Sequence, residues 1–311
     1  MGRLRHFGIS EDSAPAITQL RAVIAAFESY THPTRLSVRS SSEDLVTVQC
    51  NGFRFIADRY DFAIGYLVIA AGGFENHVTN AIRNFLRPGM IAADIGANVG
   101  FQTMNMASIL RPKGKVMAFE PSSENCRMII LNAMANDFQQ VEVYPFALSD
   151  TQGTALLNPA IGSNGILRSH DPKDPSCIVV PRMSLDQIVG SQQIDFIKID
   201  VEGAELRVML GAQLVLQRCR PVIVSEFSPA MIAANAGDKP ADYLAMMHAL
   251  GYAVHLIDQQ KGIQPEADHH KLLSEWGSMS RIEDVVFMPS RTSKRSPTKA
   301  KIARFLEAWR S

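Results

Sequence analysis

The sequence predicts an α/β fold with a mostly parallel, seven-stranded, Rossmann-like sheet and an N-terminal extension made of a helix and a β-hairpin. From residue 90 onward, short apolar runs alternate with longer segments of helical periodicity. This alternation is typical of a parallel sheet with right-handed crossovers. Several of the apolar runs end in an acidic residue, as expected at the sheet edge where α/β proteins bind ligands.

Residues 1–73 form the predicted extension. Apolar residues recur at helical spacing over 15–30, which predicts an amphipathic helix. Residues 45–56 alternate apolar and polar side chains on both sides of Asn51-Gly52, which predicts a β-hairpin. Two further helices are expected, over 62–71 and 74–86.

Residues 74–290 form the predicted main domain, and residues 291–311 a basic tail with a short amphipathic helix. Parallel strands are expected over 90–95, 115–120, 141–146, 194–199 and 221–227, and helices over 99–110, 123–136, 203–217 and 240–250. An antiparallel pair, 252–257 and 284–288, would complete the sheet. The Gly- and Pro-rich segment 151–185 predicts a lid or substrate loop, in which His170 is either a base or a solvent-exposed histidine. For the tail helix, docking on the protein or on a second subunit is preferred to a membrane face.

The composition fits a globular protein, since 46% of residues are apolar and acidic and basic residues balance at 31 each. This balance lacks the excess of positive charge that nucleic-acid binding requires. The four cysteines are scattered, so neither a zinc site nor a disulfide framework is expected. We expect a cytoplasmic protein, because neither a signal peptide nor an apolar run of roughly 18 residues is found.

The most informative segment is MIAADIGANVGF, residues 90–101. It reads as a buried strand, an acid, two glycines in the spacing D-x-G-x-x-x-G and the start of a helix. A dinucleotide fingerprint would instead read G-x-G-x-x-G and direct a helix N-terminus at a pyrophosphate. An acid before the turn favours a positively charged ligand without phosphate. S-adenosylmethionine (SAM), with its sulfonium and ammonium groups, meets this description.

A second strand, over 115–120, ends in Glu120-Pro121. In a nucleotide-binding α/β unit, an acid at this strand tip accepts hydrogen bonds from ribose hydroxyls. Pro121 then stops the strand, and Ser122 precedes the next helix. The two motifs in succession, with a helical segment between them, make SAM the expected cofactor.

Further carboxylates follow two later strands. Asp200, Glu202 and Glu205 come after the strand at 194–199, and Glu226 ends the next strand. Because ligands bind outside the carboxyl ends of strands, Asp200, Glu202 and Glu226 are the candidate catalytic residues. They could position an acceptor hydroxyl, take its proton or hold a divalent ion. Alternatively, Glu202 and Glu205 complement the dipole of the following helix, and Glu226 is a surface acid.

These segments together resemble the FkbM family of SAM-dependent O-methyltransferases over roughly residues 74–290. The motifs that carry the resemblance are Asp94-Ile-Gly-Ala-Asn-Val-Gly100, Phe119-Glu-Pro121, Ala147-Leu-Ser-Asp150, Lys198-Ile-Asp-Val-Glu-Gly-Ala-Glu205, Gly211-Ala212 and Ser225-Glu226. The resemblance implies a class I methyltransferase fold and methyl transfer to a hydroxyl of a sugar, glycolipid or polyketide-like molecule.

The resemblance also implies roles for single residues. Asp94, Gly96, Asn98 and Gly100 would hold the methionine end of SAM, Glu120 the ribose, and the turn Ala147-Leu148-Ser149 would face the adenine. Glu75 resembles a position that caps the SAM site, although a surface acid on a helix fits it equally well. The identity of the catalytic base is left open.

Two other functions stay open. A non-catalytic SAM-binding module would show the same cofactor motifs. A nucleic-acid methyltransferase fits less well, because the fourth strand leads into Asp200-Val-Glu-Gly rather than an Asn/Asp-Pro-Pro-aromatic motif, and only the basic tail favours it. The expected partner is therefore a small-molecule or saccharide acceptor, without nucleic acid or a membrane span. The sequence leaves open the acceptor, a divalent metal and a homo-oligomer.

Overall fold

The structure is a computed structural model that describes residues 44–159, 165–168, 177–268, 272–273 and 282–290 of the chain. The chain divides into two compact units, Met1–Ser42 and Glu43–Ser311, and all described residues belong to the second. The predicted helix over 15–30, His170 and the tail from residue 291 lie outside the described residues.

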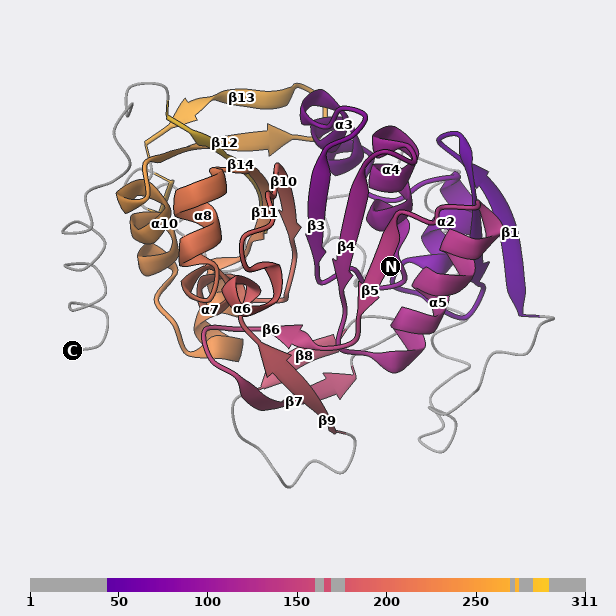
Figure 1. Ribbon diagram of the computed structural model, residues 1–311, viewed down its shortest axis with the longest axis horizontal. Helices are drawn as coiled ribbons and strands as arrows, with labels where there is room; N and C mark the ends of the chain where they lie inside the picture. The colour runs from indigo at the N-terminus through magenta and orange to yellow at the C-terminus, as the bar shows by residue number, and fades with distance from the viewer. Residues whose placement is uncertain (1–43, 160–164, 169–176, 269–271, 274–281, 291–311) are drawn as a thin grey trace, which may run out of the picture. The chain divides into compact units, whose positions relative to one another are not determined.

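The central sheet has eight strands in the order β13-β12-β14-β11-β10-β3-β4-β5 (Figure 1). The parallel strands are β3 (Ile91–Ile95), β4 (Lys115–Phe119), β5 (Val141–Tyr144), β10 (Phe196–Ile199) and β11 (Val222–Phe227). The antiparallel neighbours are β12 (Tyr252–Asp258), β13 (Gly262–Ala267) and β14 (Glu283–Pro289). The predicted α/β, Rossmann-like class with a mostly parallel sheet is thus confirmed, as is the antiparallel pair.

The prediction of seven strands was one too few, because β13 occupies a polar stretch that reads as a loop. The chain reverses tightly after β12, where the Asp258 carboxylate accepts hydrogen bonds from the N–H groups of Gln260 and Lys261 at 2.9 and 2.7 Å. Gly262 follows at φ +71°. This turn returns the chain alongside β12, and main-chain pairing extends the sheet despite the polar sequence.

The helix predicted over 203–217 is wrong, since two helices replace it, α7 (Glu205–Leu210) and α8 (Gln213–Cys219). Gly211 separates them and lies against the chain after β6. A Cβ at Gly211 would stand 2.0 Å from the carbonyl oxygen of Ser149. A tertiary contact, rather than local helix propensity, therefore ends α7.

The described parts of segment 151–185 contain strands where the sequence predicts a loop. β7 (Gly153–Pro159), β8 (Gly165–Arg168) and β9 (Ile178–Met183) join β6 (Ala147–Leu148) in a second sheet, in the order β6-β9-β7-β8. Figure 1 shows it beside the edge of the central sheet where β5 ends. Gly153, Pro159 and Gly165 stand at strand ends, so the residues that suggest an irregular loop instead bound its strands. Its action as a lid stays a prediction.

Helices cover both faces of the central sheet. α6 (Leu185–Val189), α7, α8 and α10 (Pro240–Ala249) pack on one face, and α3 (Asn76–Phe85), α4 (Phe101–Leu110) and α5 (Ser123–Ala135) on the other. Side chains of a strand alternate between faces: Ala93 and Ile95 belong to the first core and Ala92 to the second. Asp94 therefore points toward the face covered by α3 and α4.

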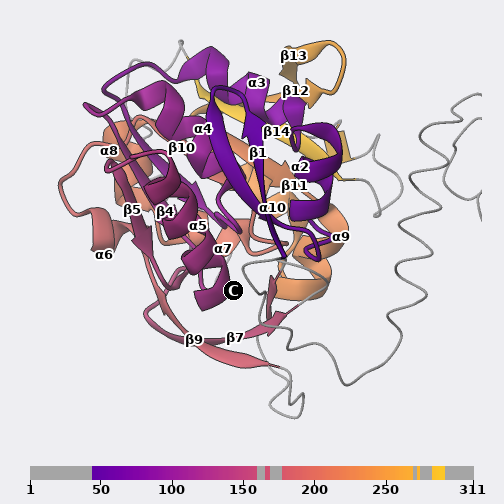
Figure 2. The same ribbon diagram turned by 90° about the vertical axis from the view of Figure 1, so that its right-hand side faces the viewer.

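The N-terminal hairpin is confirmed and shares a hydrophobic core with the main sheet. β1 (Leu45–Cys50) and β2 (Phe53–Asp58) pair across the turn at Asn51-Gly52, and α2 (Gly65–Ala71) follows. The rings of Phe53 and Phe55 contact that of Phe101 at centroid distances of 6.0 and 5.2 Å. Figure 2 shows β1 and α2 toward the viewer, with α4 and α5 nearby.

Asn132 of α5 and Asn136, the C-cap residue of the same helix, bind the free edge of β2. Asn132 Oδ1 accepts a hydrogen bond from the N–H of Ile56 at 2.6 Å, and its Nδ2 donates to the carbonyl of Ile56 at 3.1 Å. Asn136, one helical turn later, bonds the N–H and carbonyl of Arg54 in the same way at 2.7 and 2.6 Å. The two amides thus occupy the hydrogen-bonding groups that a further strand would take.

Replacing Asn132 by Ala is expected to lower the free energy of unfolding by about 1–3 kcal/mol, because it leaves an N–H and a carbonyl of Ile56 unpaired. Urea unfolding followed by circular dichroism would measure the change. The control, Gln139→Ala, alters an exposed side chain that bonds only Asp137 and should stay within about 0.5 kcal/mol. Equal stability of the two variants would contradict the role of Asn132.

Candidate functional site

A pocket at the carboxyl ends of the parallel strands brings most of the predicted site residues together. Those in its lining are Glu75, Gly96, Asn98, Glu120, Ala147, Leu148, Asp200, Glu202 and Glu226. Asp94 and Gly100, also predicted, are not part of the lining. Gly165 of β8 lines the pocket as well, so the second sheet contributes to its wall.

The glycines of the loop after β3 allow close packing of neighbouring loops. Gly96 has φ +75°, and a Cβ there would lie 1.8 Å from the carbonyl oxygen of Asp200. Gly100 has φ +89° and packs against Ile129, 2.9 Å from the position of a Cβ. Gly96 thus brings the β3 loop against the β10 loop, whereas Gly100 lets α4 begin against α5.

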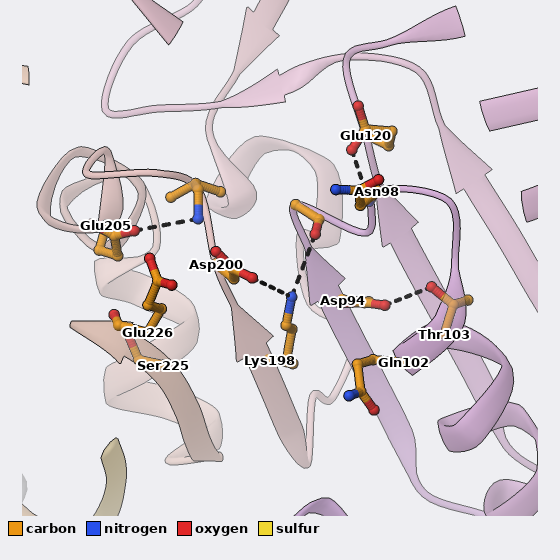
Figure 3. Close-up of polar contacts among 12 residues, drawn as sticks. Asp94, Asn98, Gln102, Thr103, Glu120, Lys198, Asp200, Glu205, Ser225 and Glu226 are labelled. Atoms are coloured by element: carbon orange, nitrogen blue, oxygen red, sulfur yellow. Dashed lines mark hydrogen bonds and ion pairs between the residues drawn. The ribbon is translucent and has the colours of Figure 1, made fainter. Parts of the chain in front are cut away.

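Glu120 holds the β3 loop from the tip of β4. Its Oε2 accepts a hydrogen bond from the N–H of Asn98 at 2.9 Å (Figure 3), and its Oε1 accepts one from the N–H of Ser122 at 2.8 Å. Burial raises the pKa of Glu120 to about 7, and these bonds limit the rise. Since a carboxylate has about four acceptor positions, Glu120 can still accept bonds from a ligand hydroxyl.

Lys198 lies among the carboxylates of the site. Its Nζ donates to Asp200 Oδ2 at 3.2 Å and to the carbonyl of Gly96 at 3.5 Å (Figure 3). Burial alone would lower the pKa of Lys198, but Asp200, Asp94 and Glu75 together raise it above its ordinary value. Lys198 is therefore a fixed cation at the base of an acidic site.

Asp94 lies behind the pocket wall. It is the register partner of Lys198 on the neighbouring strand and is fully buried. Its Oδ2 accepts a hydrogen bond from Thr103 Oγ1 at 2.5 Å, whereas its Oδ1 has no hydrogen-bond partner in the described part of the chain. Burial raises the pKa of Asp94. Direct contact of Asp94 with a ligand stays a prediction.

Glu226 and Glu75 line the pocket from β11 and from the start of α3. Glu226 Oε2 is buried without a hydrogen-bond partner among the described residues. Burial, followed by Asp200, Glu202 and Glu205, raises the pKa of Glu226 to about 10. Glu75 adopts the left-handed conformation at φ +45°, which is strained for a residue with a Cβ. Burial raises the pKa of both Glu75 and Glu202 to about 7.

Glu205 lies outside the pocket lining. Its Oε1 accepts hydrogen bonds from the N–H groups of Val201 and Gly203 at 3.2 and 3.1 Å, at the beginning of α7. This arrangement favours the structural alternative for Glu205. Glu202 has φ +55° and does line the pocket, so the two neighbouring acids face different surroundings.

Several residues at or near the site are not among the candidates that the sequence motifs indicate. Lys198 is detectable as a charge within the buried run Phe-Ile-Lys-Ile. Gln102 also lines the pocket, but it is one of several polar residues of α4, so the local sequence does not single it out. His77 Nε2 lies 2.6 Å from Asp284 Oδ2, and Asp284 is the register partner of Glu226. His77 and Asp284 are 207 positions apart in the sequence, and no motif links them.

Two further properties bear on the predicted partners. Among the described residues, no three His, Cys, Asp or Glu side chains are arranged to hold a metal ion. In the same residues, no helix combines the length and the hydrophobicity needed to cross a membrane.

The carboxylates of the site predict a stability that falls as pH rises from about 5 to 8. Folding raises the pKa of Glu75, Glu120, Glu202 and Glu205 from 4.5 to about 7. Between these values the folded protein binds more protons than the unfolded chain, so these groups lower the free energy of unfolding as pH increases. Urea unfolding across this range would measure the slope. Folding also raises the pKa of Glu226, from 4.5 to about 10, so Glu226→Gln should flatten the slope, and an unchanged slope in that variant would contradict a protonated Glu226.

Comparison with known proteins relates this chain to a family of methyltransferases and to two proteins of similar sequence. Residues 94–254 match the model of the methyltransferase FkbM domain. The hexuronic acid methyltransferase AglP of Haloferax volcanii is 31% identical over 160 residues, which cover 50% of this chain and 59% of AglP. The antimetabolite synthetase AmbE of Pseudomonas aeruginosa is 27% identical over 180 residues, covering 45% of this chain and 8% of AmbE.

Among solved structures, a methyltransferase FkbM from Methylobacillus flagellatus KT aligns with a TM-score of 0.40 and 14% identity, over 74% of this chain and 61% of that protein. In each of these pairwise comparisons the matched region spans less than two thirds of the relative's own length.

Proposed function

Because this chain belongs to the FkbM family of methyltransferases, we propose that it transfers the methyl group of SAM to a hydroxyl of a sugar or a similar small molecule. One observation carries the proposal: five carboxylates line a single pocket where the parallel strands end, namely those of Glu75, Glu120, Asp200, Glu202 and Glu226. Lys198 is the one Lys or Arg among the described lining residues. An excess of acids suits a cationic, phosphate-free ligand.

Under this proposal, each part of SAM has candidate binding residues in the pocket. Glu120, at the tip of β4, would bind the ribose, and Ala147 and Leu148 would lie against the adenine. Gly96 and Asn98 would lie along the methionine portion. When bound, SAM supplies a methyl group on a sulfonium, already activated for in-line transfer, so the protein has to orient the acceptor oxygen and remove its proton.

Asp200 is the proposed general base. It lines the pocket at the end of β10, and its ion pair with Lys198 at 3.2 Å fixes the side chain beside the acceptor position. Glu226 has a pKa of about 10 and would hold its proton at neutral pH. It can therefore donate a hydrogen bond to the acceptor but cannot take the acceptor's proton. Glu202, on the same rim, would help position the acceptor.

The acceptor class is inferred from two observations. The curated relative at 31% identity is named for a hexuronic acid. The polar side chains at the ends of β10 and β11 can bind several hydroxyl groups, as a saccharide would require. Sugars and sugar acids are accordingly the first acceptors to test.

Isothermal titration calorimetry with SAM and with S-adenosylhomocysteine tests the cofactor, with NAD as the comparison ligand. We expect binding of both adenosyl compounds and none of NAD. Conversion of SAM to S-adenosylhomocysteine with a panel of sugars and sugar acids then tests the reaction. Absence of SAM binding would refute the proposal, and binding without turnover of any acceptor would leave a non-catalytic SAM-binding module.

A further inference from the structure

Gln102 lines the pocket and has one polar group without a partner. It lies in the first turn of α4 and is 4% exposed. Its Oε1 accepts a hydrogen bond from Thr79 Oγ1 of α3 at 3.1 Å. Its Nε2 is buried and makes no hydrogen bond within the described chain. A buried N–H group without an acceptor destabilises a folded protein, so the position of Gln102 in a pocket wall indicates a ligand.

The Thr79 hydroxyl holds the oxygen end of the Gln102 amide. The Thr79 side chain is itself buried, at 2% exposure, and its hydroxyl engages the amide oxygen. The nitrogen is left for the pocket, and Figure 3 shows it on the side of Gln102 that faces Lys198. Gln102 is thus an oriented donor rather than a freely rotating amide.

Acceptors outnumber donors in this pocket, which restricts what Gln102 can bind. Besides Asn98, the side-chain N–H donors in the described lining are those of Gln102 and Lys198. Lys198 uses two of its three N–H groups for Asp200 and Gly96. A ligand carboxylate would be repelled by the ionised acids of the pocket unless it lay against these donors, and such charge-assisted bonds are strong.

We propose that Gln102 Nε2 and Lys198 Nζ together bind a carboxylate of the ligand. The inference rests on the proposed function, which supplies two sources of this group. One is the α-carboxylate of SAM, whose methionine end would extend from Glu120 on β4 toward β10. The other is the carboxylate of a sugar-acid acceptor. In both cases Gln102 is a binding residue that the motifs do not include.

The test replaces both partners of the hydrogen bond, Thr79→Val with Gln102→Leu, so that no hydroxyl is left unpaired. The probes are SAM and decarboxylated SAM, which keeps the sulfonium and ammonium groups. If the carboxylate belongs to SAM, the variant should bind SAM about 10- to 100-fold more weakly and decarboxylated SAM as well as the wild type does. If it belongs to the acceptor, binding of glucuronate should weaken by a similar factor, with glucose unchanged.

Thermal unfolding without ligand separates a binding role from a structural one. The double variant should melt no lower than the wild type, because its unpaired N–H is gone. The matched control is Gln140→Leu, which removes an amide that does have a partner, the carbonyl of Ala107 at 3.0 Å. This control should melt lower and bind both ligands normally.

The proposal is overturned if the double variant keeps the wild-type affinity for both SAM and glucuronate. Failure of the proposed function is distinguishable, because wild-type protein would then bind no SAM. In that case titration with glucuronate alone, against glucose, decides whether Gln102 binds a carboxylate.

Discussion

Replacing Asp200 by Asn is expected to reduce turnover by about 10²- to 10⁴-fold, the usual contribution of a general base. The amide keeps an oxygen that can accept the hydrogen bond from Lys198 Nζ, now 3.2 Å from Asp200, so the pocket should keep its shape. What it cannot do is take a proton from an acceptor hydroxyl. Affinity for SAM, measured by calorimetry, should change by less than about threefold, because Glu75, Glu120, Glu202 and Glu226 remain.

The control for this substitution is Asp137→Asn, the same chemical change on an exposed residue after α5, which should leave the turnover rate unaltered. Production of S-adenosylhomocysteine with the best sugar acceptor measures both variants. Wild-type turnover in Asp200→Asn would remove Asp200 from the mechanism. Loss of SAM binding together with turnover would instead assign Asp200 to the cofactor.

Replacing Gly96 by Ala should destabilise the protein by about 4 kcal/mol or more and abolish SAM binding. The left-handed conformation at φ +75° costs a residue with a Cβ about 1–2 kcal/mol. In addition, the new Cβ would lie 1.8 Å from the main-chain oxygen of Asp200, which no side-chain rotation can relieve. The β3 and β10 loops would have to separate, and the proposed cofactor-binding residues lie on both.

Gly72→Ala is the matched control, since Gly72 has nearly the same conformation, φ +70°, and nothing lies within 4 Å of the position that a Cβ would take. Gly72→Ala should lower the free energy of unfolding only by the cost of the left-handed conformation, about 1–2 kcal/mol. Urea unfolding of the two variants measures the difference, which reports the close approach of the loops. Equal destabilisation would show that the loops can separate without loss.

The central strands could be predicted because each combines a buried apolar run with a recognisable end. The run before Asp94 and the strand that ends at Glu120 need only local sequence to identify them. The hairpin is equally local, since Asn51-Gly52 supplies a two-residue turn between alternating strands. In these places the periodicity and the turn residues agree with the final fold, which is why the sequence is informative.

The differences arise where distant contacts determine the structure. Gly211 ends a helix because Ser149 lies against it, and β13 forms because the turn at Asp258 brings polar residues beside β12. The pairing of Lys198 with Asp94 depends on strand register. Likewise, the raised pKa of Glu226 depends on burial among acids from separate segments. Motif spacing carries none of this information.

The pair of asparagines at the C-terminal end of α5, Asn132 and the C-cap Asn136, has a consequence for aggregation. The outer edge of a two-stranded hairpin normally carries unpaired main-chain N–H and C=O groups. Another extended segment can pair with these groups, which leads to aggregation or domain swapping. In β2 the groups of Arg54 and Ile56 are already taken by Asn136 and Asn132. A variant that lacks both amides would expose unpaired main-chain groups along β2, so we expect it to accumulate as insoluble protein when it is expressed in cells.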